Sequence, residues 1–459
     1  MPFILNGVYL TLMLLASPWI LWAAITRGKY REGFAEKLLG RVPRRVGNRP
    51  CVWLHAVSMG EVNLLETTLA SLRQNKPEWT LVISTTTKTG YDLACKKYGA
   101  EHTVFYCPLD FSWAVKNAMQ RVRPNLLVLA ELELWPNLIR AASDCGAKVA
   151  IINGRLSDNS FRGYRRLRPL VASLLRQIDL IAAQNAETAE RFRQLGAPTE
   201  RVVVTGSLKF DGAITDRDNL RTRELRKLAD LAEDEIVFLA GSTQAPEEQY
   251  AIEIFQALAA EYPALRLVLV PRHPERFEEV AQLLERSGVR WARRSRLRCE
   301  SLDLASEGCV AATANDDNSH SAIRNPKSTI LVDTVGELSA WWGTATIGFV
   351  GGSFGSREGQ NMLEPAAYGV ATCFGPKTRN FRDIVSQLLA ACGAEVVQDR
   401  DELEQFVRRA LNDPTSARQL GQRGRALVLA QQGATERTVE LLQPLVARKP
   451  STNNSRDAA

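Results

Sequence analysis

The chain has 459 residues, of which 45% are hydrophobic and 24% charged, and its formal charge is +7. This length exceeds what one hydrophobic core supports and predicts two or three domains with the composition of an ordinary globular protein. The eight cysteines are scattered without a CxxC pair, so the sequence predicts neither a disulfide framework nor a zinc site. We also predict no metal and no cofactor, because the Asp-Arg-Asp triplets at 216–218 and 399–401 fit surface charge.

The N-terminal segment 3–25 is apolar apart from three polar residues, and residues 26–50 then carry eight basic and two acidic side chains. About 20 apolar residues cross a hydrocarbon core. Because the basic residues follow the apolar run, a cleavable signal peptide is disfavoured. The pattern predicts a membrane anchor at 1–26, with the body of the protein on the cytoplasmic side. Pro18 leaves open a segment that enters one leaflet without crossing. This placement of charge favours a membrane surface over nucleic acid.

From residue 51 onward, apolar strands alternate with helices, which is the pattern of a parallel sheet covered on both faces. The first repeat predicts a Rossmann-like domain at 27–212. Its strands are expected at 51–56, 80–85, 102–107, 125–131, 148–153, 180–185 and 201–206.

The alternation restarts after a polar, charge-rich linker at 213–234 and predicts a second Rossmann-like domain at 235–447. Its strands are expected at 236–241, 265–271, 328–333, 345–352, 370–375 and 394–398. A polar insert at 298–327 is interpreted as a surface loop, and 448–459 as a disordered tail. Two doubly wound α/β domains that face a cleft are the predicted architecture.

Glu61 is a candidate catalytic residue in the strand–turn–helix segment 51–72. It lies in the first turn of the helix, at the carboxyl end of a strand, where open α/β sheets bind ligands. The N–H groups at the start of a helix stabilise an anion, typically by about 0.3–1 kcal/mol. From these residues alone, an ordinary helix-start glutamate is therefore the simpler interpretation.

Two other segments of the first domain bring charged residues to strand ends. Glu131 and Glu133 follow an apolar strand in AELELWPNL, and strand alternation would send them to opposite faces, so that at most one enters a site. Lys209 follows the last strand, in TGSLKFD, and Arg155 follows another, in NGRLS. Charged residues in an ordinary solvent-exposed loop would give the same sequence pattern.

The second domain has three weak nucleotide-binding signals. A strand ends in Pro-Arg, a Gly turn opens a helix whose N–H groups suit phosphate, and a Gly-rich loop runs into another helix. Neither a GxGxxG nor a Walker sequence is present. The residues concerned are Pro271, Arg272, Gly336, Glu337, Leu338, Asn361, Met362, Leu363 and Glu364.

The segments HAVSMGEV, ELELWPN, NGRLS and TGSLKFD occur in this order, and the chain resembles the 3-deoxy-D-manno-octulosonic acid (Kdo) transferases from the N-terminal segment to residue 376. The resemblance implies an inverting glycosyltransferase of the GT-B type that moves Kdo from CMP-Kdo to a lipid A precursor, lipid IVA, at the inner membrane without a metal. It also implies that Glu61 is the general base, that Glu131 and Lys209 stabilise the transition state, and that the nine residues above bind CMP.

The sequence departs from the family pattern in the Gly-rich segment, where Gln360 and Met362 replace the usual His and Pro. Gln cannot carry a proton, so the resemblance gives no acid–base role there. Two alternatives stay open. One is a GT-B enzyme with another nucleotide sugar or lipid acceptor, and the other is a non-catalytic, membrane-anchored binding protein with the same fold.

Overall fold

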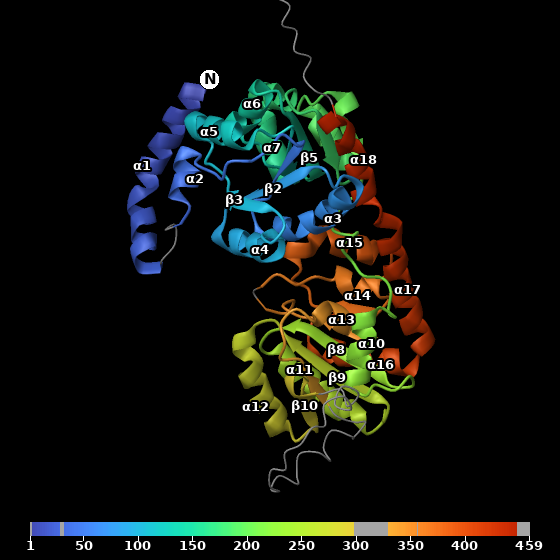
Figure 1. Ribbon diagram of the computed structural model, residues 1–459. Coiled ribbons are helices and arrows are strands. Elements are labelled where there is room, and N and C mark those ends of the chain that lie inside the picture. Colours follow the sequence, from blue (N-terminus) through green and yellow to red (C-terminus); the bar gives the residue numbers. More distant parts are fainter. Residues whose placement is uncertain (1, 28–31, 298–328, 356, 448–459) are drawn as a thin grey trace, which may run out of the picture. The chain divides into compact units, whose positions relative to one another are not determined.

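The computed structural model describes residues 2–27, 32–297, 329–355 and 357–447, and the chain forms two compact units (Figure 1). Unit 1 contains residues 1–212 and 431–459, and unit 2 contains residues 213–430. The insert 298–327 and the tail 448–459 of the sequence analysis lie outside the described residues.

Unit 1 is built on a seven-stranded, fully parallel sheet in the order β3-β2-β1-β4-β5-β6-β7. Each strand overlaps an apolar run that predicted one, because strands covered on both faces are continuously apolar. The strands are β1 (Cys51–His55), β2 (Thr80–Thr85), β3 (Thr103–Tyr106), β4 (Leu126–Ala130), β5 (Lys148–Gly154), β6 (Leu180–Ala183) and β7 (Val202–Val204).

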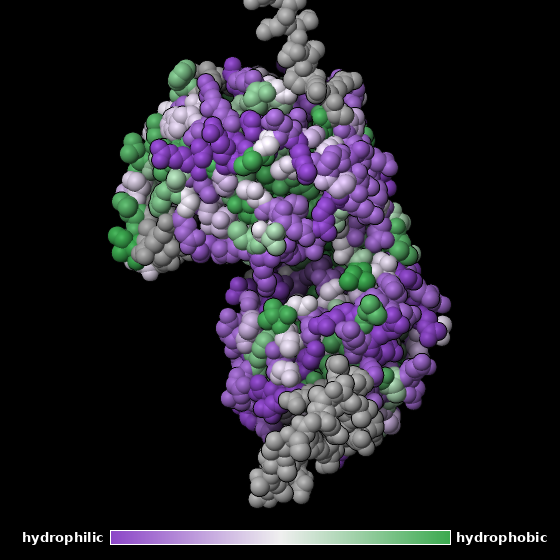
Figure 2. Space-filling model, viewed as in Figure 1, coloured by the Kyte–Doolittle hydropathy of each residue, from purple (hydrophilic) through white to green (hydrophobic). Residues whose placement is uncertain are grey.

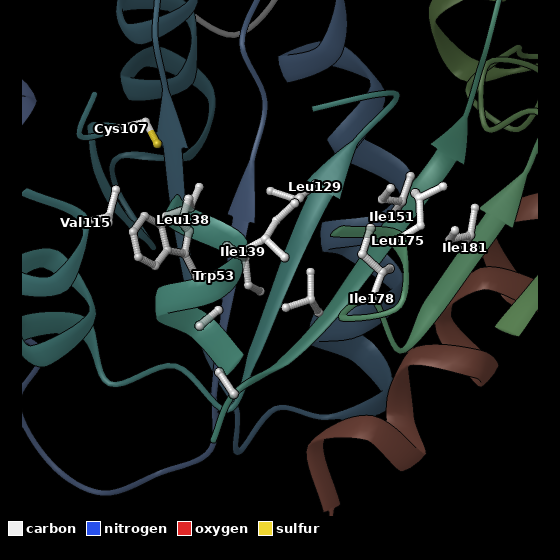
Figure 3. Packing of buried hydrophobic residues seen from close by; sticks show 14 of the residues in the cluster. Trp53, Cys107, Val115, Leu129, Leu138, Ile139, Ile151, Leu175, Ile178 and Ile181 are labelled. Carbon is white, nitrogen blue, oxygen red and sulfur yellow. The ribbon is translucent and has the colours of Figure 1, made fainter. Parts of the chain in front are cut away.

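Helices cover both faces of this sheet. One face packs against α5 (Ser112–Val122), α6 (Pro136–Asp144), α8 (Arg168–Leu175) and α9 (Ala186–Gln194). Figure 3 shows this core around Trp53, with Leu138 and Ile139 of α6 directed at the sheet. The other face packs against α3 (Met59–Asn75), α4 (Lys88–Tyr98) and α18 (Ala434–Ala447). The remaining helical segments are α1 (Pro2–Arg27), α2 (Phe34–Leu39), α7 (Asp158–Arg166) and η1 (Thr199–Arg201).

The C-terminal helix α18 belongs to unit 1, whereas the sequence analysis assigned it to the second domain. It packs on α3, β5 and β6. Its start is fixed by Asp211, whose carboxylate accepts hydrogen bonds from Gly433 N (2.7 Å) and Thr435 N. Periodicity indicates that a helix has an apolar face but not which sheet that face covers.

Replacing Leu442 of α18 by alanine should destabilise unit 1 by about 2–5 kcal/mol, the usual cost of a Leu-sized cavity. Leu442 is fully buried in the core shared with α3. Urea unfolding of the full chain, followed by the fluorescence of the tryptophans, measures this loss. Glu440→Ala, at an exposed position of the same helix, is the control. Equal, small losses in both variants would contradict the packing of α18 against unit 1.

Helix α1 contains residues 2–26 of the predicted anchor, and polar contacts attach it to unit 1. Asn6 exchanges two hydrogen bonds with Ser112, at 2.7 and 3.0 Å, and Tyr9 donates to Asp110 at 3.1 Å. Of the helices in the described ranges, none is long and apolar enough to cross a membrane. The predicted membrane-spanning segment is therefore not supported. The docked polar residues are a physical reason why this helix differs from a plain apolar span.

The exposed side of α1 is nevertheless rich in large apolar side chains. Figure 2 shows hydrophobic residues along this helix. Exposed apolar residues of α1 include Phe3, Val8, Leu12, Leu14, Leu15, Trp19, Leu21 and Ile25. Two side chains of the basic block, residues 26–50, contact the rest of unit 1. Arg45 donates to the carbonyls of Val122 and Arg123, and Lys37 lies 3.8 Å from the centre of the Tyr106 ring.

Unit 2 has a second seven-stranded parallel sheet, in the order β10-β11-β9-β8-β12-β13-β14. The strands are β8 (Ile236–Thr243), β9 (Leu265–Pro271), β10 (Trp291–Arg293), β11 (Thr329–Leu331), β12 (Ile347–Val350), β13 (Ala371–Phe374) and β14 (Glu395–Val396). Strand β10 was not predicted, because this three-residue edge strand contains arginine and has no apolar run.

Most helices of unit 2 lie between these strands in sequence, whereas the first precedes β8 and the last two follow β14. The helices of unit 2 are α10 (Leu220–Leu228), α11 (Glu247–Ala259), η2 (Pro274–Arg276), α12 (Phe277–Ser287), η3 (Arg294–Arg296), α13 (Leu338–Trp342), α14 (Leu363–Ala367), η5 (Arg379–Phe381), α15 (Arg382–Ala390), α16 (Arg400–Asn412) and α17 (Pro414–Gln431).

The segment interpreted as a linker is largely part of unit 2. Arg217 is half-buried and donates to the carbonyls of Tyr368 (2.8 Å) and Ala345 (2.6 Å), and desolvation lowers the pKa of its guanidinium to about 10. Thr222 and Leu225 bury one side of α10 against unit 2. The sequence did not predict this amphipathic helix, because most of its residues are charged and only Thr222 and Leu225 are buried.

Candidate active site

The first strand of each unit lies in the middle of its sheet, and the strand order reverses beside it: between β1 and β4 in unit 1, and between β8 and β12 in unit 2. At such a point the loops leave toward opposite faces, and the crevice between them is the usual ligand site of open α/β sheets. In unit 1, Glu61 follows β1 and Glu131 follows β4. In unit 2, Glu247 follows β8 and the glycine-rich loop 351–355 follows β12.

Glu61 closes a capping box at the start of α3. Its carboxylate accepts hydrogen bonds from Val57 N and Ser58 Oγ, both at 2.9 Å, while Ser58 Oγ accepts from Glu61 N at 3.5 Å. Reciprocal bonds of this kind satisfy the free N–H groups of the first helical turn. The structural role foreseen for a helix-start glutamate is therefore present, and it also holds the carboxylate in one place.

The surroundings of Glu61 favour the protonated form. Burial raises the pKa of its carboxyl above the usual value, the negative charge of Glu131 adds to this, and the bonds from Val57 and Ser58 only partly offset it. The helix dipole, considered alone, would lower the pKa of Glu61 by stabilising its anion. A carboxylate with a raised pKa is a stronger proton acceptor, as a general base requires.

Glu131 and Lys209 form an ion pair at this edge, with 3.5 Å between Lys209 Nζ and Glu131 Oε1. Their side chains are 26% and 39% exposed, so the pair adds little to stability. Glu131 has a left-handed backbone (φ 58°), which non-glycine residues adopt at a cost of about 1–3 kcal/mol where structure demands it. Its N–H donates to Ile152 O at 2.9 Å.

The loop that carries Lys209 is fixed on both sides. Leu208 and Phe210 are each 2% exposed, so the lysine between them is directed outward from a buried anchor. Leu208 N donates to Asn153 Oδ1 at 3.0 Å, and Asn153 lies near the end of β5, next to Ile152, whose carbonyl accepts from Glu131 N. Asn153 thus supports the lysine loop, a role that sequence reasoning missed. Arg155 follows at the same edge.

Glu133 lies near both of the other carboxylates, contrary to the expectation that alternation would separate it from Glu131. Strand β4 ends at Ala130, and alternation does not continue into the left-handed turn that follows. Burial raises the pKa of Glu133 to about 7, and the charges of Glu61 and Glu131 add to this, against the hydrogen bond from Trp135 Nε1 at 2.7 Å.

Glu133→Gln should remove a pH-dependent loss of stability. The folded chain binds this proton more tightly than the unfolded chain does, whose pKa is 4.5, so stability falls as pH rises from about 4.5 to about 7. The variant should gain about 1–3 kcal/mol over the wild type at about pH 8 and nothing at about pH 4. Urea unfolding at both values tests this, with the exposed Glu200→Gln as control. A gain that does not depend on pH would contradict it.

In unit 2, Arg272 after β9 interacts electrostatically with Glu364 at the start of α14. Arg272 is exposed, and its charge opposes the burial that raises the pKa of Glu364. Asn361 Nδ2 donates to Glu364 Oε1 at 2.9 Å, and Asn361 Oδ1 accepts from Leu363 N at 3.1 Å. Arg272 and Glu364 together present a cation and a hydrogen-bond acceptor at one place, which suits a phosphate and a hydroxyl group.

The turn 336–338 leads into α13 with Gly336 at φ 91°. The Glu337 carboxylate is bound within the protein: it accepts from Arg294 at 2.8 and 2.9 Å, from Arg221 at 2.8 Å and from Thr334 at 2.7 Å. Although burial raises the pKa of Glu337, these bonds and charges hold it below its usual value. Any ligand contact of Glu337 therefore uses its backbone.

Met362 and Leu363 are buried, at 0% and 3% exposure. A contact of this segment with a ligand is thus limited to the backbone and to the side chains of Asn361 and Glu364. Gln360 lies against the loop glycine Gly352, with its side chain about 3.1 Å from where a Cβ would be. Gln360 therefore has a packing role, which needs no proton.

Sequence reasoning missed the two carboxylates at the start of α11. Glu247 accepts four backbone hydrogen bonds, and Glu248 accepts from Arg276 at 3.0 and 3.2 Å. Both residues are almost fully buried. Their only sequence signal is a pair of acids after an apolar strand, which is also typical of any helix start.

Two parallel Rossmann-like sheets with polar residues at their switch points define a protein of the GT-B-like α/β class. Solved structures of this fold are similar to the chain. A putative UDP-N-acetylglucosamine 2-epimerase from Listeria monocytogenes matches 86% of this chain and 96% of its own, with TM-score 0.54 and 10% identity. A glycosyltransferase from Rickettsia africae matches 88% and 100%, with TM-score 0.52 and 11% identity.

The chain belongs to the 3-deoxy-D-manno-octulosonic-acid transferase (kdotransferase) family and is a glycosyltransferase. The family's N-terminal domain matches residues 31–212. The 3-deoxy-D-manno-octulosonic acid transferase of Haemophilus influenzae is 32% identical over 96% of this chain and 98% of its own length. That of Bordetella pertussis is 30% identical over 95% and 99%.

Proposed function

We propose that this protein is an inverting transferase that moves Kdo from CMP-Kdo to a lipid A precursor, lipid IVA, in lipopolysaccharide core synthesis. Family membership supports the transfer of Kdo. The observation that carries the chemistry is the Glu61 carboxylate, fixed by Val57 N and Ser58 Oγ beside the Glu131–Lys209 pair. A positioned base near a cation is what hydroxyl attack on an anionic sugar donor needs.

In the proposed reaction, Glu61 takes the proton of the acceptor hydroxyl as its oxygen bonds to the anomeric carbon. The bond between that carbon and the phosphate oxygen breaks, and CMP leaves with the electron pair. Because attack and departure occur on opposite sides of the carbon, the configuration inverts. Lys209, oriented by Glu131, stabilises the negative charge that the donor carries in the transition state.

In this proposal, unit 2 binds the CMP part of the donor. Arg272 pairs with the phosphate, the backbone N–H groups of 336–338 donate to it, and Glu364 accepts hydrogen bonds from the ribose. The exposure of Arg272 and its electrostatic interaction with Glu364 support this assignment. The proposal needs only backbone contacts from Met362 and Leu363, in agreement with their burial.

The test is transfer from CMP-Kdo, generated in situ, to a tetra-acylated lipid A precursor by the full chain in detergent, with the products resolved by mass. A product heavier by one or more Kdo residues is expected. CMP should compete with the donor, whereas UDP at the same concentration should not. Competition by UDP alone would indicate another nucleotide sugar, and CMP binding without any product would favour another acceptor or a non-catalytic binding protein.

We further propose that the protein works at the inner membrane surface, with its body on the cytoplasmic side. The exposed apolar side chains of α1 and the basic block 26–50 support this, because an apolar face beside basic residues binds the interface of an anionic membrane. Sedimentation with vesicles that contain anionic phospholipid should capture the full chain, less so at high salt. A chain that lacks α1 should bind more weakly.

A further inference from the structure

The glycine-rich loop after β12 is occupied from within the protein. Glu247, in the first turn of α11, is 1% exposed. Its Oε2 accepts from Gly352 N at 2.7 Å and from Gln244 N at 2.9 Å, and its Oε1 accepts from Ser353 N at 3.0 Å and Phe354 N at 3.1 Å. Three successive N–H groups of the loop therefore point at one buried carboxylate.

These four bonds favour the ionised form of Glu247, although burial raises the pKa of its carboxyl above the usual value. Both oxygens accept two hydrogen bonds each, and a protonated oxygen would need an acceptor of its own. In the part of unit 2 that the structure describes, Glu247 has no ion-pair partner. The charge is balanced by backbone dipoles, as an anion is in a nest of N–H groups.

The first glycine of the loop, Gly351, lies in close contact with this carboxylate. A Cβ on Gly351 would lie 2.7 Å from Glu247 Oε2 and 2.6 Å from the Cα of Thr243. Both distances are shorter than real Cβ contacts. Gly351 therefore lets both the strand end and the carboxylate approach the loop, so contacts within the protein are enough to explain a glycine at this position.

The fixed loop in turn supports the segment that precedes α14. Gly359 N donates to Gly352 O at 2.8 Å, and Gln360 packs on Gly352. Asn361 and Glu364 follow directly and hydrogen-bond to each other. A continuous set of contacts thus runs from Glu247 through Gly352 to the residues assigned to the donor.

We propose that Glu247 is a positioning residue for donor binding: its carboxylate fills the glycine-rich loop from within the protein and sets the position of residues 359–364. The donor phosphate is then bound outside this loop. This inference rests on the proposed function for the identity of the donor, but the contacts that carry it do not depend on that identity.

The first test compares CMP binding by calorimetry in the wild type, Glu247→Gln and a control. The Gln amide places an N–H group against the donors of the loop, so the dissociation constant of CMP and the KM of the donor should rise roughly tenfold or more, because small misplacements of binding groups are costly. The acceptor KM should stay unchanged. An unaltered dissociation constant for CMP would overturn the proposal.

Glu235→Gln is the matched control. Glu235 is also a buried carboxylate of unit 2, bound to Arg266 at 2.9 and 3.2 Å, but it lies at the amino edge of the same sheet, where β8 and β9 begin. The Glu235→Gln substitution should lower the melting temperature without changing the affinity for CMP. A comparable loss of CMP affinity in both variants would show that Glu247 acts only through stability.

Glu247→Ala gives an independent readout. Formate is small enough to replace the missing carboxylate, so adding it should restore CMP affinity in this variant and have no effect on the wild type. Hydrogen exchange of 351–364, measured without nucleotide, should be faster in Glu247→Gln and normal in Glu235→Gln. If the wild type does not bind CMP, the proposed donor fails, while unchanged exchange would refute the role of Glu247 itself.

Discussion

Replacing Glu61 by glutamine should lower the kcat of sugar transfer by roughly 10²–10⁴-fold, the usual contribution of a general base. Glutamine has the same shape, and its oxygen still accepts a hydrogen bond from Val57 N or Ser58 Oγ, so the capping box is partly kept. It has no lone pair basic enough to take the acceptor's proton. The transfer assay with products resolved by mass, beside calorimetry with CMP, measures both consequences.

CMP affinity and the melting temperature should change little in Glu61→Gln. Ser58→Ala is the companion variant, because it removes the N-cap hydroxyl at a cost of about 1 kcal/mol but leaves the carboxylate in place. It should keep much more activity than Glu61→Gln. If Glu61→Gln transferred sugar at the rate of the wild type, the carboxylate would be only a helix cap.

Lys209→Met should lower kcat by roughly 10²–10³-fold, as expected for the loss of one group that stabilises transition-state charge. Methionine keeps the apolar stem between the buried neighbours Leu208 and Phe210, so the loop should stay folded. Because the pair with Glu131 is partly exposed, the melting temperature should fall little. Rates at saturating acceptor and donor measure the effect on kcat apart from binding.

Lys148→Met is the matched control for this variant. Lys148 forms an ion pair with Asp179 at 2.9 Å in the same unit, but at the start of β5, on the opposite edge of the sheet. Its loss should leave kcat unchanged. The double variant with Glu131→Gln and Lys209→Met should be little worse than Lys209→Met alone, since Glu131 is proposed to act by orienting the lysine. Additive losses would contradict that coupling.

The two parallel sheets could be predicted from the sequence because their strands are buried on both faces. Such strands are short apolar runs, and the intervening helices have apolar residues on one side. The succession of strands and helices along the chain is therefore encoded in local sequence patterns. Edge strand β10, with arginine among its three residues, lacks that signal. The amphipathic helix α10 was hidden by the charge of its exposed side.

The assignment of segments to units depended on contacts that local patterns do not contain. Helix α18 joins unit 1 because Asp211 binds its start and Leu442 fits the core beside α3. The apolar N-terminal segment suggested a span, but hydrogen bonds from Asn6 and Tyr9 dock α1 on unit 1. For α18 the apolar face was predicted but its partner was not, and for α1 the polar contacts with unit 1 were not predicted.

For the site, the sequence alone determined the residue types at the strand ends. Glu61, Glu131 and Lys209 each follow an apolar strand, and parallel strands bring their carboxyl ends to one edge. The tertiary structure decided the distances and the charge balance: burial raises the pKa of Glu61, a left-handed turn brings Glu133 near it, and Glu247 reaches a loop 105 residues away. Desolvation and long-range hydrogen bonds depend on what the fold places around a group, and neighbours in sequence do not reveal that.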